Sequence, residues 1–137
     1  MTESMKAPSI DAWLREAKED PGFRACGMYL IHNGVVRETP KAQVRDVVTS
    51  GVRPGGKVAG MIFGSDPEKV ALAIERTRAM PGVGYVRVWL NEGELAVGDD
   101  IMLVLIGGDI RPHVVDALQF LVGTLKDECV TEVELGA

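Results

Sequence analysis

The spacing of apolar residues along the chain predicts several strands. The clearest is GYVRVWL (84–90), in which Tyr85, Arg87 and Trp89 alternate with aliphatic residues, as expected of a strand with two different faces. IMLVLIGG (101–108) is nearly all apolar, which is typical of a strand that is covered on both faces. Three further segments have strand character, namely ACGMYLIHN (25–33), KVAGMIF (57–63) and VTEVEL (130–135).

Two of these strands have a further feature that the sequence predicts. Gly34 follows the first strand and permits a bend or bulge there. Glu132 and Glu134 are two residues apart in the last strand, so their side chains are expected on the same face.

Apolar residues at helical spacing predict three helices. Ser9 is positioned to cap the first, and Ser65-Asp66-Pro67-Glu68 starts the second with a capping side chain and a proline in the first turn. The last helix opens at Asp109 or Arg111 and ends at Lys126. Its predicted core stripe consists of Val114, Leu118, Leu121, Val122 and Leu125.

Other segments have a weaker pattern. PKAQVRDVV (40–48) is compatible with a short helix or a strand, and GVRPGG (51–56) has the composition of a loop. NEGELAVGDD (91–100) is predicted to be a tight turn between two strands. Because helices and strands alternate irregularly, we predict an α+β fold, a sandwich with a mostly antiparallel sheet and helices packed on it. The length of 137 residues indicates a single domain over 1–137.

Composition and charge narrow the classes of function. A net charge of −5 argues against general nucleic-acid binding, and an aromatic content of 5% argues against a base-stacking surface. No apolar run approaches the length of about 20 residues that spans a bilayer, so no membrane association is expected. Cys26 and Cys129 suggest neither a disulfide framework nor a zinc site. A cytoplasmic location follows, and no metal or cofactor is expected.

Three cations are the best candidates for binding chemistry. Arg37 follows a strand and a glycine, Arg111 opens a helix, and Lys126 ends it. A cation at a helix N-terminus opposes the helix dipole, so Arg111 is easier to understand if an anion binds there. The simpler reading of Lys126 is a favourable helix C-terminal charge, and that of Arg37 is a solvated strand end. His32 is read as a core or strand-end histidine.

Order and spacing of several motifs give a resemblance to a known family. Gly27 and Gly34 precede Val36-Arg37 in a strand and bend, and a turn reads Gly93-Glu94-Leu95-Ala96-Val97-Gly98-Asp99. An apolar strand, a helix that ends in Leu125-Lys126 and a final strand follow. The chain resembles the large, catalytic subunit of molybdopterin synthase over about 26–37 and 58–135.

The resemblance implies an α/β hammerhead fold and a homodimer. It also implies a partner, a small ubiquitin-like sulfur-carrier protein whose C-terminal Gly-Gly thiocarboxylate inserts into this subunit. The implied reaction transfers sulfur to cyclic pyranopterin phosphate in molybdenum cofactor biosynthesis. By this mapping Arg37 and Arg111 are substrate-binding residues, and Lys126 is a catalytic residue that polarises the thiocarboxylate or moves protons.

The sequence departs from the family pattern at several positions. The family's histidine before Arg111 is replaced by Ile110, and its second lysine by Val133. Leu90-Asn91 replaces the family's His-Arg before the Gly-Glu-Leu turn, and Gly64-Ser65-Asp66 replaces an acidic-aromatic patch. These changes motivate an alternative hypothesis, a non-catalytic binding or accessory protein that keeps the fold and dimer but has lost sulfur transfer.

Helix geometry adds one expectation about the site. Lys126 follows Arg111 by 15 residues, which corresponds to roughly 22 Å along a helix. Both residues therefore cannot serve one small pocket within one protomer. We predict that Arg111 of one protomer reaches a shared anion pocket at the interface, together with Arg37 and Lys126 of the other.

Overall fold

The computed structural model of the chain describes residues 7–40 and 56–136. The two predictions for 40–48 and 51–56 fall almost entirely outside these residues. The described elements, in chain order, are α1 (Ile10–Glu19), a 3-10 helix (Pro21–Ala25), β1 (Met28–Val35), β2 (Val58–Ser65), α3 (Pro67–Arg78), β3 (Val83–Leu90), β4 (Gly93–Ala96), β5 (Asp100–Gly108), α4 (Arg111–Thr124), a π-helical turn (Leu125–Cys129) and β6 (Val130–Gly136).

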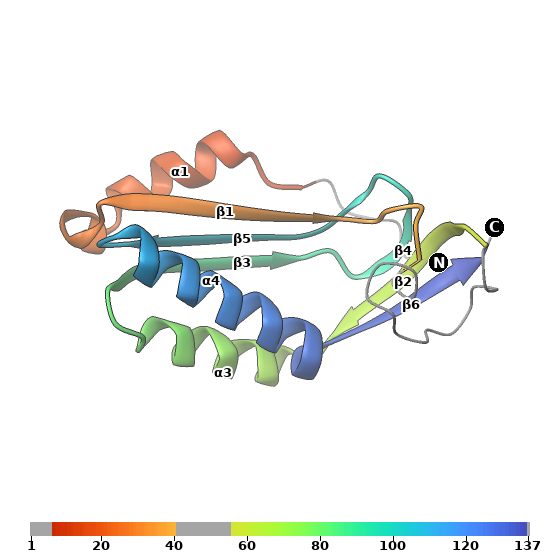
Figure 1. Cartoon of the computed structure of the whole chain (residues 1–137). Coiled ribbons are helices and arrows are strands. Elements are labelled where there is room, and N and C mark those ends of the chain that lie inside the picture. The colour runs from red at the N-terminus through yellow and green to blue at the C-terminus, as the bar shows by residue number, and fades with distance from the viewer. Residues whose placement is uncertain (1–6, 41–55, 137) are drawn as a thin grey trace.

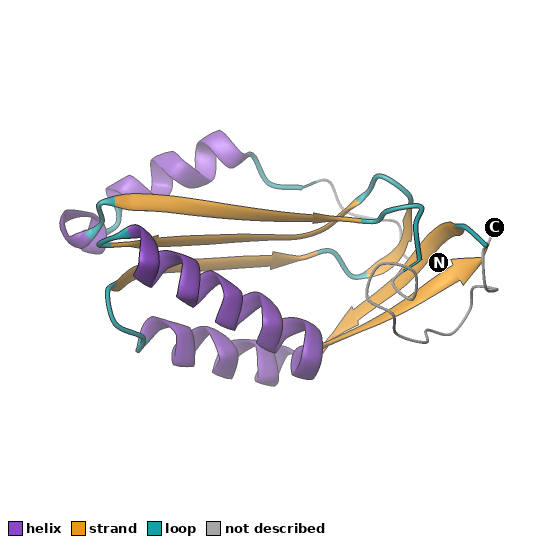
Figure 2. Ribbon diagram, viewed as in Figure 1, coloured by secondary structure: helices purple, strands orange, loops and turns teal. Residues whose placement is uncertain are grey.

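The larger sheet has the strand order β1-β5-β3, and both pairings are antiparallel. Its central strand, β5, is buried from Ile101 to Gly108, as the apolar run predicted. Helix α1 covers one face of this sheet through Trp13 and Ala17, which pack against Leu103 and Leu105. Helices α3 and α4 cover the opposite face (Figures 1 and 2). The alternation predicted for β3 matches these two layers.

The smaller sheet has the order β4-β2-β6, and it is also antiparallel in both pairings. It lies beyond the end of α4, to one side of the larger sheet (Figure 1). The prediction of a simple tight turn over 91–100 is wrong, because Gly93–Ala96 forms β4 and pairs with β2. The chain turns back only after Ala96, where Gly98 has a φ of 93°.

Local sequence explains how the helices begin. Ser9 caps α1 by accepting a hydrogen bond from the Ala12 amide at 3.2 Å. Asp66 caps α3 by accepting from the amides of Glu68 and Lys69. Helix α4 differs, because it has no side-chain cap. Its buried stripe contains the predicted Val114, Leu121 and Leu125, together with Ala117, while the predicted Leu118 and Val122 are half-buried.

The ends of two predicted elements need correction. The first strand begins at Met28 rather than Ala25, which lies in the 3-10 helix, and the strand is half-buried rather than buried. The irregularity predicted at Gly34 is confirmed by a register shift between Gly34 and Val35. The last helix ends as an α-helix at Thr124, so Lys126 lies in the π-helical turn that follows. None of the helices in the described ranges has the length and apolar character needed to cross a bilayer.

Candidate functional site

A small pocket forms where the end of β1 meets the π-helical turn and the smaller sheet. It has a volume of about 30 Å³, which is room for roughly two water molecules. Its lining combines apolar and charged side chains, namely Val35, Arg37, Met61, Ile101, Lys126, Glu132 and Glu134. Two of the three predicted site residues, Arg37 and Lys126, therefore lie at the same pocket within one protomer. We call this the Lys126 pocket.

Lys126 is held against a buried carboxylate of β6. Its Nζ lies 3.8 Å from Glu132 Oε1, and the exposed fractions of the two side chains are 21% and 4%. Glu134, on the same face of β6, is also buried. A carboxylate that leaves water needs an opposite charge or hydrogen bonds, so Lys126 and Glu132 stabilise each other in this position. The π-helical turn sets this geometry, because it carries Lys126 back toward the strand that follows it.

Arg37 borders the pocket from the exposed segment after β1. Its Nε donates a hydrogen bond to the Thr39 carbonyl oxygen at 3.0 Å, which uses one of the five N–H donors of the guanidinium. The neighbouring Val36 is buried in the core and fixes the backbone at this point. Its amide donates to the Asp99 carbonyl oxygen, and its own carbonyl accepts from Gly98. Arg37 thus extends from an anchored backbone and stays accessible to solvent.

His32 is a neighbour of Lys126 that the sequence interpretation left out of the site. Within the described residues its Nε2 is buried and has no hydrogen-bond partner. Burial, reinforced by the positive charge of Lys126, lowers the pKa of His32 below its usual value, so the ring is neutral at neutral pH. The sequence could have indicated that His32 faces the core. It follows Met28 and Leu30 at the spacing of one strand face, and both of these residues pack against the core.

Arg111 lies away from this pocket. It is the first residue of α4 and is exposed, whereas the π-helical turn with Lys126 follows the other end of the helix (Figure 1). The separation expected from helix geometry is therefore observed within one protomer. Of the two predicted starts of this helix, Arg111 is confirmed, and Asp109 lies before the helix without capping it. Its carboxylate accepts from the amide of Ile110 at 2.6 Å and contacts His113 Nδ1 at 2.8 Å, and this contact is the main reason that the pKa of Asp109 is lowered.

Two of the substituted family positions, Val133 and Ile110, are on the surface. Val133 has an exposed fraction of 41% and lies on the face of β6 opposite Glu132 and Glu134. It pairs with Ile62, which is also exposed. Ile110 has an exposed fraction of 53% and precedes the first residue of α4. In this protomer neither position lines the Lys126 pocket.

The donor groups of the described residues include no cluster of three or more His, Cys, Asp or Glu side chains suited to a metal ion. The chemistry available at the Lys126 pocket is instead that of an ammonium group, a guanidinium and two carboxylates. These groups can bind anions, polarise a carbonyl oxygen and move protons.

Comparison with known proteins identifies a family. A family model described as MoaE protein matches residues 4–128. No curated protein matches the sequence.

Solved structures of similar fold agree with the family match. A molybdopterin synthase structure from Staphylococcus aureus is 16% identical, with a TM-score of 0.71 over 97% of this chain and 88% of that one. A molybdopterin biosynthesis MoaE protein from Burkholderia ambifaria is 18% identical, with a TM-score of 0.65 over 97% and 86%.

A third structure is a complex of subunits 1 and 2 of the molybdopterin-converting factor from Helicobacter pylori. The matched chain is 13% identical, with a TM-score of 0.63 over 93% of this chain and 79% of that one. At such identities the likeness concerns the fold, and it confirms the predicted α+β class.

Proposed function

The chain belongs to the MoaE family, and from this membership we propose that it is the catalytic subunit of a molybdopterin synthase, acting in the cytoplasm. Its reaction would transfer sulfur from the C-terminal thiocarboxylate of a small carrier protein to cyclic pyranopterin phosphate. The observation that carries the proposal is the meeting of Arg37 and Lys126 at one pocket. The resemblance assigns these two residues to substrate binding and catalysis.

Each side chain has a physically reasonable role in this reaction. In the proposed step the thiocarboxylate sulfur bonds to a pterin carbon, and water then attacks the carbonyl carbon of the resulting thioester, so that the C–S bond to the carrier breaks and the carrier leaves as a carboxylate. The Lys126 ammonium donates a hydrogen bond to the carbonyl oxygen and stabilises the negative charge that develops on it. Arg37 binds an anionic group of the pterin, because its planar guanidinium forms paired hydrogen bonds with phosphate oxygens. Glu132 holds Lys126 in place at 3.8 Å.

The charge balance favours a contribution from a second protomer. Two cations and two acidic side chains line the Lys126 pocket, so one protomer alone provides no excess of positive charge for an anionic substrate. The volume of about 30 Å³ is also far below the roughly 300 Å³ of small ligand pockets. A homodimer that brings Arg111 of its other protomer to this pocket would supply a cation and a further wall.

The carrier protein is the proposed second partner. The converting-factor complex from Helicobacter pylori contains two different subunits, and a chain of that complex shares this fold. A flexible Gly-Gly tail is narrow enough to enter a crowded site, since glycine has no side chain. The carrier would thereby form part of the wall that one protomer lacks.

Reconstitution tests the proposal. Purified protein, a thiocarboxylated carrier and cyclic pyranopterin phosphate should yield molybdopterin. Lys126→Ala should lower the rate by about a hundredfold or more, which is the usual contribution of a positioned proton donor. Lys57→Ala is the matched control, because Lys57 is exposed and forms a surface ion pair with Glu38. Absence of product with a carrier that supports a complete family member would reject the enzymatic function.

A second candidate is a binding or accessory protein of the same family without sulfur transfer. It is favoured by Val133, which stands at the position where the family has its second lysine and supplies no ammonium group. This hypothesis predicts that the carrier tail or the pterin binds without turnover. It further predicts that Val133→Lys creates synthase activity in an otherwise inactive protein, and an active wild-type protein would contradict it.

A further inference from the structure

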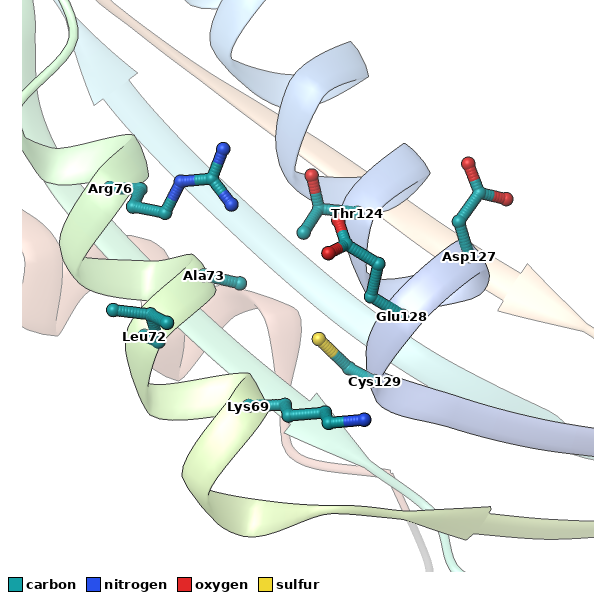
Figure 3. A pocket seen from close by; sticks show the side chains of 8 residues that line it. All are labelled: Lys69, Leu72, Ala73, Arg76, Thr124, Asp127, Glu128 and Cys129. Atoms are coloured by element: carbon teal, nitrogen blue, oxygen red, sulfur yellow. The ribbon is translucent and has the colours of Figure 1, made fainter.

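A larger cleft lies between α3 and the π-helical turn, and it is not accounted for by the proposed function. Its volume of about 430 Å³ falls in the range of about 300–1,000 Å³ that is usual for small-ligand pockets. It is lined by Lys69, Leu72, Ala73, Arg76, Thr124, Asp127, Glu128 and Cys129 (Figure 3). It shares no lining residue with the Lys126 pocket. We call it the α3 cleft.

The two walls of the α3 cleft carry charges of opposite sign. Lys69 and Arg76 are seven residues apart on α3, about two helical turns, and therefore project from the same side of the helix. The facing wall, formed by the π-helical turn, carries Asp127 and Glu128. Figure 3 shows Lys69 and Arg76 reaching from α3 toward this wall, while Glu128 points into the cleft and Asp127 lies at its outer rim.

These charges face each other without pairing across the gap. Among the described residues no salt bridge connects α3 with the π-helical turn, although other surface pairs such as Arg78–Glu75 do form. Arg76 is held instead by the ring of Phe120, with its guanidinium carbon 5.1 Å from the ring centroid. Stacking leaves the in-plane N–H groups of a guanidinium able to donate hydrogen bonds.

The floor between the charged walls is apolar. Ala73 and Cys129 are buried, and burial raises the pKa of the Cys129 thiol, so it stays neutral and behaves as a small apolar group. Leu72 has an exposed fraction of 60%, which leaves its side chain free to cover an apolar part of a ligand. The α3 cleft thus presents a cationic wall, an apolar floor and an anionic wall in sequence.

We propose that the α3 cleft is a second ligand site, which binds a small linear zwitterion with its anionic end at Lys69 and Arg76 and its cationic end at Glu128. The methylene chain of the ligand lies over Ala73 and Leu72. A ligand of this chemistry satisfies both walls at once, whereas an ion of either sign satisfies one and is repelled by the other. This site is independent of sulfur transfer.

Solution NMR of the isotope-labelled full chain tests the proposal with a matched series of probes. 6-Aminohexanoate carries a carboxylate and an ammonium, hexanoate only the carboxylate, and hexylamine only the ammonium. We expect 6-aminohexanoate to bind with roughly millimolar affinity and to shift the amide signals of 69–76 and 124–129. The two singly charged probes should bind about two- to fivefold more weakly, since each lacks one charge contact.

Two substitutions with matched controls locate the charges. Arg76→Gln and Glu128→Gln should each weaken binding of 6-aminohexanoate about two- to fivefold. Arg78→Gln and Glu75→Gln are the controls, because these residues lie on α3, pair with each other on the surface and do not line the α3 cleft. Their affinities should equal that of the wild type.

Three outcomes would overturn the proposal. They are equal affinities for the three probes, signal shifts confined to other parts of the chain, and an unchanged affinity in both cleft variants. All of them are read from the folded protein without any enzyme assay. A failure here is therefore distinct from a failure of the proposed sulfur transfer.

Discussion

Lys126 and Glu132 form a partly buried pair whose members depend on each other. Lys126→Ala leaves the Glu132 carboxylate, 4% exposed, without its ammonium neighbour. We expect this change to lower the free energy of unfolding by about 1–3 kcal/mol, the usual cost of a buried polar group that loses its partner. Adding Glu132→Gln should recover part of this loss, because the amide is neutral. Urea unfolding of the two single variants and the double variant measures the coupling.

A result in which the two substitutions are simply additive would contradict this pairing. Such additivity would mean that other neighbours of Glu132 carry its stabilisation. Arg78→Gln with Glu75→Gln offers a control cycle, since that pair is exposed and should show a coupling of less than about 1 kcal/mol.

His32 predicts a pH dependence of stability with a definite sign. Its pKa is lowered in the folded state by burial and by the charge of Lys126. The unfolded chain therefore takes up a proton at a higher pH than the folded one, and His32 destabilises the fold as the pH falls through its unfolded pKa of about 6.5. His32→Leu removes this effect, so the variant should become more stable relative to the wild type as the pH is lowered. Urea midpoints at a neutral and at a mildly acidic pH test this.

A stability difference between His32→Leu and wild type that does not change with pH would refute the prediction. His113→Leu is the matched control, because His113 is a more exposed histidine that contacts Asp109 rather than Lys126. Loss of the His113 side chain should change stability in the pH range in which Asp109 titrates, rather than in that of His32. The pKa of Asp109 is lowered in the folded state. Its contribution to stability is therefore fully present above the pKa that Asp109 has in the unfolded chain, and it is lost as the pH falls through the pKa of the folded state.

At the level of single residues, part of the lining of the Lys126 pocket was predictable. Arg37 and Lys126 were identified from the resemblance, and alternation along the last strand correctly put Glu132 and Glu134 on one face. The sequence could not indicate what that face contacts. This depends on the pairing of β6 with β2 and on the π-helical turn, which rest on contacts between distant segments. His32 was missed because a histidine within an apolar strand is more often structural.

At the level of elements, Gly82 between α3 and β3 is a position where only glycine fits. Its φ is 77°, and a Cβ there would collide with the side chains of Asp109 and His113. Gly98 has a φ of 93° but open space around it. We therefore expect Gly82→Ala to lower the free energy of unfolding by more than Gly98→Ala. Backbone strain alone accounts for about 1–2 kcal/mol in the latter.

Thermal or urea unfolding of the two glycine variants checks this ranking. Equal losses would show that Asp109 and His113 move aside at little cost. In that case their contact at 2.8 Å would not constrain the entrance to α4.

Elements with a strong local signal were predicted well, and those that depend on remote pairing were not. The caps at Ser9 and Asp66 gave correct helix starts. Strand β4 was missed because its four residues, Gly93–Ala96, have no alternation long enough to detect. It is held in a sheet by its pairing with β2, which lies more than twenty positions earlier in the chain. The second sheet as a whole therefore required the structure.

At the level of the whole molecule, the two ends of α4 define the functional question. Arg111 is the first residue of α4, and the π-helical turn that carries Lys126 follows the other end of the helix. Figure 1 shows the first end of α4 beside the larger sheet and its last end beside the smaller one. The proposed anion site, which combines Lys126 with Arg111, would therefore require two copies of the chain. We expect the protein to be a dimer by light scattering, and a monomer under assay conditions would contradict the shared site.

The most direct test of this account is complementation between two inactive variants. Lys126→Ala and Arg111→Ala should each lose synthase activity alone. In a mixed dimer, one of the two sites combines Lys126 of one protomer with Arg111 of the other and is intact. Co-refolding equal amounts should therefore restore about one quarter of the wild-type sites, since half of the dimers are mixed and half of their sites are complete. The shared site is contradicted if mixed dimers form but the synthase activity of the mixture does not rise above that of the separate variants.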